Sequence, residues 1–240
     1  MTAKTAPKRA MVLAAGRGKR MQPLSDHLPK PLLVVAGRTL LDRAIDRLAE
    51  AGVTDVVVNL HHLGEKIREQ LQKRDGLRIH YSEETELLET GGGIRRALSH
   101  FQGEPFFVVN GDVLWQDGES PALLRLARAW NDETMDGLLL VQALARATGY
   151  DGKGDFEIDA GGRLARRKAQ TAPFVFTGVQ LLHPRLFAES PEGPFSLNLL
   201  YDRALAAGRL FGLAHAGTWY HVGTPEGLAL AEEKFRESPA

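Results

Sequence analysis

The residues best suited to chemistry lie between positions 13 and 32, where a short apolar run passes into glycines, basic side chains and prolines. Backbone N–H groups can approach a phosphate closely only where no Cβ intervenes, and fixed positive charges offset the charge on phosphate oxygens. A strand followed by such a segment predicts a loop that holds a polyphosphate. The glycines and cations of this segment are Gly16, Arg17, Gly18, Lys19, Arg20 and Lys30.

The spacing of this segment differs from two better-known phosphate loops. It lacks the Gly-x-x-x-x-Gly-Lys-Ser/Thr pattern of a P-loop, and Met21 stands where a Rossmann fingerprint has its third glycine. Gly16 and Gly18 alone are equally compatible with a solvated basic loop. Arg20 and Lys30, together with the prolines on either side of Lys30, favour phosphate binding.

An acidic residue follows the fourth apolar run of the chain, in the order Asn110-Gly111-Asp112. In proteins, Mg²⁺ is commonly bound by one or two carboxylates together with phosphate oxygens and water. Asp112 is therefore a candidate metal ligand beside the phosphate loop. A polar turn is the alternative interpretation of the same three residues.

Three successive glycines at positions 91–93 follow Glu89 and Thr90. Each glycine costs about 1 kcal/mol relative to alanine inside a helix, so the run indicates a helix start that a flat base or a phosphate approaches closely. A flexible hinge is the alternative. His221, which precedes a Gly-Thr-Pro helix start, is a further candidate, although a lone histidine more often has a structural role.

Patterns that would supply a nucleophile are absent from the chain, namely Gly-x-Ser-x-Gly, His-Glu-x-x-His and paired cysteines. Their absence favours chemistry in which the protein positions two substrates and neutralises their charge. A phosphate oxygen of one substrate would attack the α-phosphorus of the other, with a divalent cation and basic side chains stabilising the charge.

The elements that must position these residues alternate between strand and helix in the first half of the chain. Continuous apolar runs between amphipathic helices imply a parallel sheet covered on both faces. Right-handed crossovers place the carboxyl ends of such strands on one edge, where the loops at 14–30, 82–93 and 110–112 are expected to converge. The expected strands are 10–13, 55–59, 77–81 and 105–109, and the expected helices are 40–50, 63–71 and 92–101.

The second half is expected to be a less regular mixture of helices and strands. Gly161 and Gly162 predict the turn of a hairpin between residues 154–159 and 163–168. The other expected elements are strands at 138–142, 174–182 and 220–222 and helices at 124–130, 197–207 and 225–235.

Composition narrows the classes of function. A chain of 240 residues suits one sizeable domain, and its formal net charge of zero does not suggest binding to nucleic acid or to a membrane surface. The absence of cysteine removes disulfides and thiolate catalysis and suits the cytoplasm. Residues 1–8 are polar and are expected to form a flexible tail, and no apolar run is long enough to span a membrane.

Three motifs together resemble the sugar-1-phosphate nucleotidyltransferases, and the resemblance extends from residue 9 to about residue 235. The motifs are Leu-Ala-Ala-Gly-Arg-Gly-Lys-Arg-Met at 13–21 with Pro29-Lys30-Pro31, Glu-Thr-Gly-Gly-Gly at 89–93, and Asn110-Gly111-Asp112. The resemblance implies an α/β fold of the Rossmann-like nucleotidyltransferase type, with three α/β/α layers and a central, mostly parallel mixed sheet. It also implies a single domain at 9–240, with a nucleotide-binding half at about 9–115 and a sugar-binding half at about 116–240.

The activity implied by the resemblance is Mg²⁺-dependent transfer of a nucleotidyl group from an NTP to a sugar 1-phosphate, with release of pyrophosphate. The short length and the segments at 152–156, 176–179 and 182–184 look most like the uridylyltransferases that act on N-acetylmuramate 1-phosphate in peptidoglycan recycling. UTP and that sugar phosphate are therefore the expected partners of a cytoplasmic monomer or small homo-oligomer, with no nucleic acid and no membrane. The alternatives are guanylyl or other nucleotidyl transfer to a hexose or heptose 1-phosphate such as mannose 1-phosphate, and a non-catalytic nucleotide-sugar-binding regulatory subunit.

The family's functional residues carry over to specific positions of this sequence. Arg20 would act on the leaving pyrophosphate, Lys30 would contact the α-phosphate and the sugar phosphate, and Asp112 would hold Mg²⁺. The nucleotide-binding residues would be Leu13, Ala14, Ala15, Gly16, Arg17, Gly18, Lys19, Thr90, Gly91 and Gly92. The sugar-binding residues would be Asn110, Asp155, Thr177 and Gly178.

One position departs from the family pattern. The resemblance places a second metal-binding aspartate where this chain has His221, in Trp-Tyr-His-Val-Gly-Thr. Neutral imidazole is a poor ligand for Mg²⁺ but accepts softer ions such as Mn²⁺. Three outcomes follow: His221 ligates through nitrogen, water fills the ligand position, or catalysis is impaired. Retained activity with an altered metal affinity is expected, because Arg20, Lys30 and Asp112 are all present.

Overall fold

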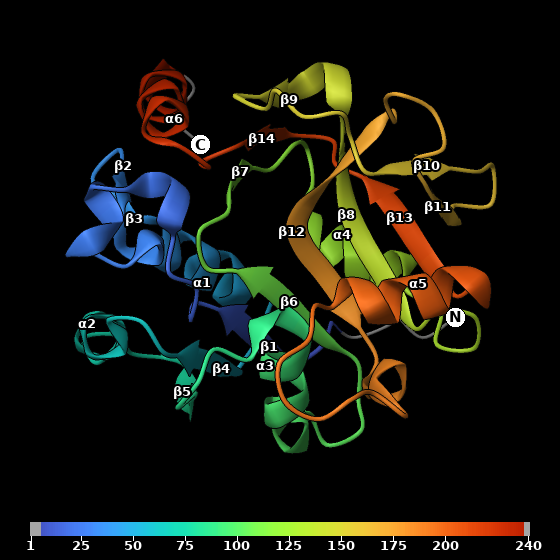
Figure 1. Cartoon of the computed structure of the whole chain (residues 1–240), viewed down its shortest axis with the longest axis horizontal. Helices are drawn as coiled ribbons and strands as arrows, with labels where there is room; N and C mark the ends of the chain where they lie inside the picture. Colours follow the sequence, from blue (N-terminus) through green and yellow to red (C-terminus); the bar gives the residue numbers. More distant parts are fainter. Residues whose placement is uncertain (1–5, 238–240) are drawn as a thin grey trace.

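Parallel strands alternate with helices through the first half of the chain, in a computed structural model that describes residues 6–237 (Figure 1). The parallel strands lie side by side in the order β5, β4, β1, β6, so the sheet begins with the four strands that the apolar runs predicted. Their bounds are β1 Arg9–Leu13, β4 Asp55–Leu60, β5 Arg78–Glu83 and β6 Phe106–Asn110.

Antiparallel strands from the second half extend the same sheet beyond β6. The long strand β12 (Phe174–Leu182) runs antiparallel to β6 and also to β8 (Gly137–Ala143). Strand β13 (Leu210–Ala214) runs parallel to β8 on the outside. A hairpin of β10 (Phe156–Ile158) and β11 (Leu164–Arg166) pairs with the start of β12, which confirms the hairpin predicted at Gly161 and Gly162.

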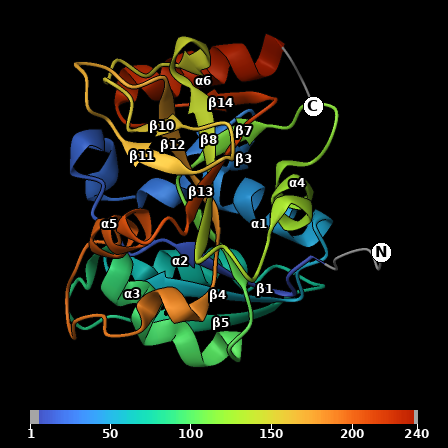
Figure 2. The same ribbon diagram turned by 90° about the vertical axis from the view of Figure 1, so that its right-hand side faces the viewer.

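Helices cover both faces of this sheet, so the fold has the predicted three α/β/α layers (Figure 2). Alternate residues of β1 explain why: Ala10 and Val12 pack into one apolar core and Met11 packs into the other, because side chains alternate across a strand. Helices α1 (Leu40–Glu50), α2 (Gly64–Leu71) and α4 (Ala122–Ala129) cover the first face. Helices α3 (Glu89–Ala97) and α5 (Asn198–Ala206) cover the second.

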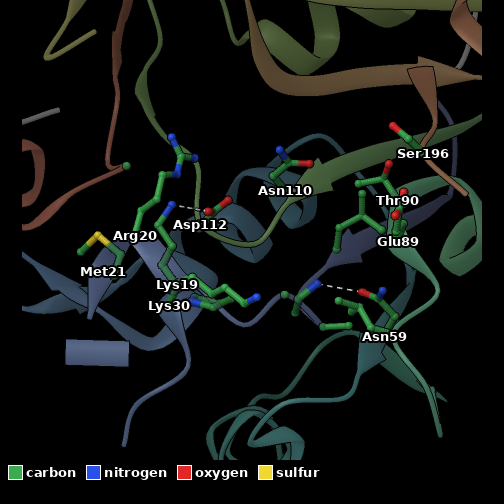
Figure 3. A pocket seen from close by; sticks show the side chains of 18 residues that line it. Lys19, Arg20, Met21, Lys30, Asn59, Glu89, Thr90, Asn110, Asp112 and Ser196 are labelled. Carbon is green, nitrogen blue, oxygen red and sulfur yellow. Dashed lines mark hydrogen bonds and ion pairs between the residues drawn. The ribbon is translucent and has the colours of Figure 1, made fainter. Parts of the chain in front are cut away.

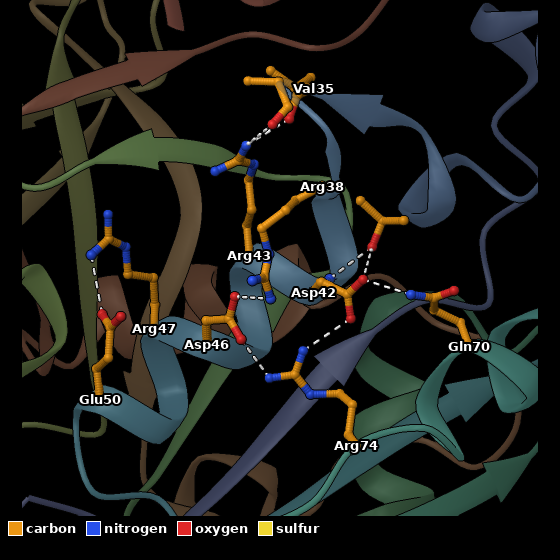
Figure 4. Close-up of polar contacts among 11 residues, drawn as sticks. Val35, Arg38, Asp42, Arg43, Asp46, Arg47, Glu50, Gln70 and Arg74 are labelled. Atoms are coloured by element: carbon orange, nitrogen blue, oxygen red, sulfur yellow. Dashed lines mark hydrogen bonds and ion pairs between the residues drawn. The ribbon is translucent and has the colours of Figure 1, made fainter. Parts of the chain in front are cut away.

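Helix α1 is anchored at its start by polar contacts (Figure 4). The Thr39 side chain caps it by accepting from the Asp42 N–H at 3.0 Å. The Arg74 guanidinium, which lies just after α2, pairs with Asp42 at 2.9 Å and with Asp46 at 2.5 Å. These partly buried ion pairs join α1 to the end of α2, on the sheet face that α1, α2 and α4 cover.

A third apolar cluster lies outside the two sheet faces. Its residues come from the loop after β1, from β2 (Val34–Val35), which forms a small hairpin with β3 (Arg38–Thr39), from the first residue of α1, and from α6 (Pro225–Glu237). Leu114 and Tyr220 join it from β7 (Leu114–Gln116) and β14 (Thr218–Tyr220), which form a small sheet with β9 (Ala147–Thr148). In Figure 1, α6 lies beside β2 and close to β14. The buried residues of this third cluster are Met21, Leu33, Val35, Leu40, Leu114, Tyr220, Val222, Ala231 and Phe235.

Several boundaries differ from the sequence prediction. The helix expected at 92–101 begins earlier, at Glu89, and its last turn over 98–101 is a 3₁₀ turn. The strand expected at 220–222 is β14, which ends at Tyr220. Strands β2, β3, β7, β9 and β13 were not predicted, because most are two or three residues long and depend on pairing with distant partners.

The expected tail at 1–8 is partly outside the described residues, which begin at position 6. Lys8 itself is joined to the domain: its Nζ donates to the Gly52 carbonyl at 3.1 Å, and its backbone carbonyl accepts from Thr54 and Asp55. None of the helices within residues 6–237 is long and apolar enough to cross a membrane.

Candidate active site

Two cavities meet at the carboxyl ends of the parallel strands. The larger, of about 510 Å³, lies between the predicted phosphate loop and the start of α3 (Figure 3). The smaller, of about 330 Å³, lies against β12 and β14. All three loops that were expected to converge line the larger cavity, which confirms that expectation. The residues that line both cavities are Arg20, Lys30, Asn110 and Asp112.

The loop after β1 is folded back on itself at Gly18. This glycine has a φ of +61°, and an added Cβ would lie 3.3 Å from the Cβ atoms of Lys30 and Ser25. Ser25 Oγ donates to the Gly18 carbonyl at 2.9 Å, and the Met21 N–H donates to the same carbonyl at 2.8 Å. Glycine at this position therefore lets the first part of the loop pack directly against the segment that carries Lys30.

Charged side chains concentrate at the junction of the cavities. Lys30 Nζ lies 2.5 Å from Asp112 Oδ2, and the two side chains are 12% and 33% exposed. The Arg20 side chain makes no hydrogen bond or ion pair with any of residues 6–237, and Figure 3 shows its guanidinium beside this pair. A cation that is held in place and a cation that is free therefore face the same space, an arrangement suited to phosphate groups.

The three glycines of α3 are packed against the chain itself. A Cβ at Gly91 would lie 2.3 Å from the Phe195 ring, and a Cβ at Gly92 would lie 2.4 Å from the Gly193 carbonyl. The N–H groups of Gly91 and Gly92 both donate to the Phe195 carbonyl. These two glycines admit the 193–195 segment, whereas Thr90 lines the larger cavity and accepts from the Leu197 N–H at 2.9 Å.

The smaller cavity contains all four residues that the resemblance assigned to the sugar. Asp155 accepts from the Phe176 N–H at 2.9 Å, so one carboxylate oxygen is fixed to the β12 backbone. The Thr177 hydroxyl is turned into the sheet and donates to the Leu140 carbonyl at 2.8 Å. Gly178 has a φ of +86°, and a Cβ there would lie 2.8 Å from Asn110 Nδ2. Gly178 thus makes room for the side chain of Asn110.

His221 lies at the aromatic wall of the smaller cavity. Its ring contacts Tyr150 edge-on, with 5.4 Å between the ring centroids, and lies 5.7 Å from the Trp219 ring. Burial lowers the pKa of His221, and the nearby charges of Lys30 and Arg20 lower it further, against the opposing effect of Asp112. The imidazole is therefore neutral at neutral pH, with a nitrogen lone pair available to a ligand.

Most of the residues assigned from the sequence line one of the cavities. Arg17 is exposed and, like Gly91 and Gly92, lines neither of them. The assigned residues in the larger cavity are Leu13, Ala14, Ala15, Gly16, Gly18, Lys19, Arg20, Lys30, Thr90, Asn110 and Asp112. Those in the smaller cavity are Arg20, Lys30, Asn110, Asp112, Asp155, Thr177, Gly178 and His221.

Other cavity residues were not identified from the sequence. Asn59 and Ser196 line the larger cavity, and Tyr150, Phe176 and Trp219 line the smaller one. Asn59 carried a usable signal, since a polar residue closes an otherwise apolar strand. The three aromatic residues carried none, because aromatic side chains are common in apolar cores.

The fit of a divalent cation follows from the donors present. Among residues 6–237, no group of three His, Cys, Asp or Glu side chains could hold a metal ion by itself. Asp112 is the one carboxylate among the residues that line both cavities. Mg²⁺ commonly takes one or two carboxylates and completes its shell with phosphate oxygens and water. The donor set therefore fits a cation that binds together with a phosphate-bearing substrate.

Comparison with solved structures supports the fold. A UDP-glucose pyrophosphorylase complexed with UDP-glucose has a TM-score of 0.80 at 17% identity, over 96% of this chain and 98% of that chain. The inositol-1-phosphate CTP transferase from T. maritima has a TM-score of 0.77 at 20% identity, over 98% of both chains. The Rossmann-like nucleotidyltransferase fold predicted from the sequence is confirmed.

Comparison of the sequence with known proteins assigns the chain to a family. An N-acetylmuramate alpha-1-phosphate uridylyltransferase from Caulobacter vibrioides is 41% identical over 239 residues, which cover 97% of this chain and 99% of that protein. A protein of the same name from Neisseria meningitidis is 36% identical over 220 residues, or 90% and 93% of the two chains. The model of the MobA-like NTP transferase domain matches residues 10–143. The chain therefore belongs to the MobA-like NTP transferase family, as a nucleotidyltransferase of the sugar-1-phosphate type that its motifs predicted.

Proposed function

We propose that this enzyme transfers the uridylyl group of UTP to N-acetylmuramate α-1-phosphate, giving a UDP-sugar and pyrophosphate. The observation that carries the proposal is the pair of cavities that share Arg20, Lys30, Asn110 and Asp112. Two phosphate-bearing substrates bound on either side of these residues would meet at the shared charges. The names of the Caulobacter and Neisseria relatives support the choice of nucleotide and sugar.

The reaction needs no nucleophile from the protein. An oxygen of the sugar 1-phosphate attacks the α-phosphorus of UTP, a new P–O–P bond forms, and the bond from the α-phosphorus to the bridging oxygen of the β-phosphate breaks. The electron pair leaves with pyrophosphate. Lys30 lies between the cavities and would stabilise charge on the transferred phosphate, while the unpaired Arg20 would stabilise the leaving pyrophosphate.

The family generally uses a divalent metal ion. In this chain Asp112 would hold it, and the metal would neutralise phosphate charge when bound. We propose Mg²⁺, with Mn²⁺ as a substitute because the neutral His221 ring also faces the smaller cavity. Removing divalent cations with EDTA should abolish turnover, and adding Mg²⁺ back should restore it.

A substrate panel tests the proposal. Pyrophosphate release would be measured for UTP, GTP, CTP and dTTP, each with N-acetylmuramate, glucose and mannose 1-phosphates. The highest kcat/KM is expected for UTP with N-acetylmuramate α-1-phosphate. Preference for GTP with mannose 1-phosphate would favour a second candidate function instead. That candidate is supported by 28% identity to a Xenopus laevis mannose-1-phosphate guanyltransferase beta-B, of which this chain covers 62%.

We further propose that catalysis needs no partner beyond the two small substrates and the divalent cation, and that the enzyme acts in the cytoplasm. The absence of cysteine is consistent with a reducing compartment. A net charge of zero gives no support to nucleic-acid binding. Sedimentation of the active enzyme would decide between a monomer and a small homo-oligomer.

A further inference from the structure

A chain of buried hydrogen bonds connects the ends of three neighbouring parallel strands. The Ala14 N–H, just after β1, donates to Asn59 Oδ1 in β4 at 2.7 Å (Figure 3). Asn59 Nδ2 donates to Glu84 Oε1, just after β5, at 2.7 Å. The other carboxylate oxygen, Glu84 Oε2, accepts from the Leu88 N–H at 2.9 Å. The chain therefore runs from the first residue of the phosphate loop to the residue that precedes α3.

These groups are withdrawn from solvent. Asn59 is 3% exposed and Glu84 is 5% exposed, and Glu84 forms no ion pair with any other described residue. Gly93 in α3 leaves the space they occupy, since a Cβ there would lie 2.8 Å from Glu84 Oε1 and 3.0 Å from Asn59 Nδ2. A buried carboxylate without a cation is costly unless hydrogen bonds satisfy it, so these hydrogen bonds are essential to keeping Glu84 in this place.

The direction of each hydrogen bond is fixed. Both carboxylate oxygens of Glu84 accept, and the amide of Asn59 must accept from Ala14 with its oxygen and donate to Glu84 with its nitrogen. An amide at position 84 would turn its NH₂ group toward another donor, either Asn59 Nδ2 or the Leu88 N–H. Flipping Asn59 does not relieve the conflict, because its NH₂ group would then face the Ala14 N–H.

We infer that Asn59 and Glu84 are positioning residues that hold the phosphate loop and the start of α3 in register, so that the nucleotide cavity is formed before substrate binds. Ala14, Asn59 and Thr90 line that cavity, Glu84 lines neither cavity, and Asn59 does not reach the sugar cavity. The inference rests on the proposed function only in assigning the larger cavity to a nucleoside triphosphate. A defect in this pair should therefore weaken nucleotide binding and leave sugar phosphate binding unchanged.

An exchange of acid and amide tests this inference. Asn59→Asp alone would place two carboxylates in contact, and Glu84→Gln alone would place a donor against a donor. The double variant restores every bond with the original net charge: an Asp carboxylate accepts from Ala14 and from the Gln amide, whose oxygen accepts from Leu88. Glu83→Gln is the matched control, because the neighbouring Glu83 side chain is 68% exposed and pairs with Arg68 at the surface.

The measurements are the Kd of UTP by titration calorimetry, the KM of the sugar 1-phosphate at saturating UTP, and thermal unfolding as a check on the fold. Each single variant should raise the Kd of UTP about tenfold or more, as expected for an unsatisfied buried group, with the KM of the sugar phosphate unchanged. The double variant should bind UTP about fivefold more tightly than either single variant. Glu83→Gln should bind as the unsubstituted enzyme does.

A folded double variant that binds UTP no better than Glu84→Gln overturns the inference, as does an equal rise of both substrate constants in the single variants. If a single variant does not fold, recovery of fold and UTP binding in the double variant supports the inference, and failure of the double variant overturns it. If the unsubstituted enzyme prefers GTP, CTP or dTTP, the proposed function fails while the positioning test proceeds with that nucleotide. Binding of none of the four overturns both.

Discussion

The two cavities of the active site differ in the groups that line them. The larger one lies where parallel strands end, and much of its lining is backbone and small side chains such as Ala14, Ala15 and Gly16. The smaller one lies against antiparallel strands and is lined by larger side chains, including Tyr150, Phe176 and Trp219. Backbone N–H groups suit the triphosphate that every NTP has, whereas side chains suit a particular sugar. We expect nucleotide phosphates to be recognised by chain conformation and the sugar by side-chain identity.

The cavities also differ in the contacts that keep their walls in place. The larger one is tied by hydrogen bonds through Asn59 and Glu84 between consecutive strands. The smaller one combines Arg20 and Lys30 with residues between positions 110 and 222, and its wall at β14 is backed by the apolar cluster that includes Tyr220 and Phe235. This difference predicts that substitutions in the Asn59 and Glu84 hydrogen bonds weaken nucleotide binding. Substitutions in the apolar cluster at α6 should instead disturb the residues shared by both cavities and the smaller cavity.

The largest effect on activity is expected for a residue that lines both cavities. Lys30→Ala removes one of the two cations that both cavities share and leaves Asp112 without its ion-pair partner. Loss of one preorganised charge-stabilising group costs about 10²–10³ in kcat, so kcat should fall by that factor with either substrate saturating. Lys73→Ala, at an exposed lysine outside both cavities, is the control. A rise in the KM of one substrate with kcat preserved would place Lys30 in a single cavity.

Phe235→Ala tests the packing behind the junction. The Phe235 ring is 6% exposed, lies 5.9 Å from the Tyr220 ring between centroids, and has the Arg43 guanidinium 4.2 Å from its centre. Its removal should lower the free energy of unfolding by about 3 kcal/mol and Tm by about 6–12 °C. Calorimetry would measure both, with Phe235→Leu expected to lose much less. An unchanged Tm would mean that α6 does not support the site.

Gly178→Ala should disturb the smaller cavity, assigned to the sugar, more than the larger one. The added Cβ would lie 2.8 Å from Asn110 Nδ2 and would push that side chain from the junction. We expect the KM of the sugar phosphate to rise about tenfold, as for a displaced polar contact, with the Kd of UTP changed much less. Gly37→Ala is the matched control, since its φ of +78° carries the same backbone strain with no neighbour within 4 Å. Equal effects in the two variants would show backbone strain alone.

The smallest effect is expected in the pH dependence of stability. Burial lowers the pKa of His215 below its usual value, and its Nε2 donates to the Gln116 carbonyl at 3.1 Å under the β7–β14 sheet. The unfolded chain therefore binds a proton that the folded chain does not, so stability falls as pH drops below about 6.5. Thermal unfolding between about pH 7 and pH 5 should show a shallower decline in His215→Gln. An identical slope would assign the decline to other groups.

The sequence predicted the strands and helices around the larger cavity better than those around the smaller one, for a physical reason. The apolar runs and the glycines at 16 and 18 act through local geometry, which determines where strands end and where loops turn. Strand β13 escaped prediction because Leu-Phe-Gly-Leu-Ala becomes a strand only by pairing with β8. Similarly, the convergence of Tyr150 and Trp219 beside His221 depends on tertiary contacts that no spacing reveals.

The glycines of α3 show a different limit. Their positions correctly marked the start of a helix, but a missing side chain indicates only that something approaches closely. In this structure that neighbour is the chain itself, at Phe195 for Gly91 and at Gly193 for Gly92. Gly93 makes room for Glu84 and Asn59 in the same way. Sequence alone does not distinguish a protein neighbour from a ligand at such a position.

The position of α6 has a consequence for how the enzyme is made. This 13-residue helix comes after all the other described elements. Its Glu232 nevertheless accepts from the Ala36 N–H at 2.6 Å, and its Phe235 packs behind the loop that carries Arg20. During synthesis the amino-terminal strands leave the ribosome first and can pair early. The support for Arg20 and His221 is complete only after α6 has left the ribosome, so the amino-terminal strands can pair before the junction between the cavities is competent.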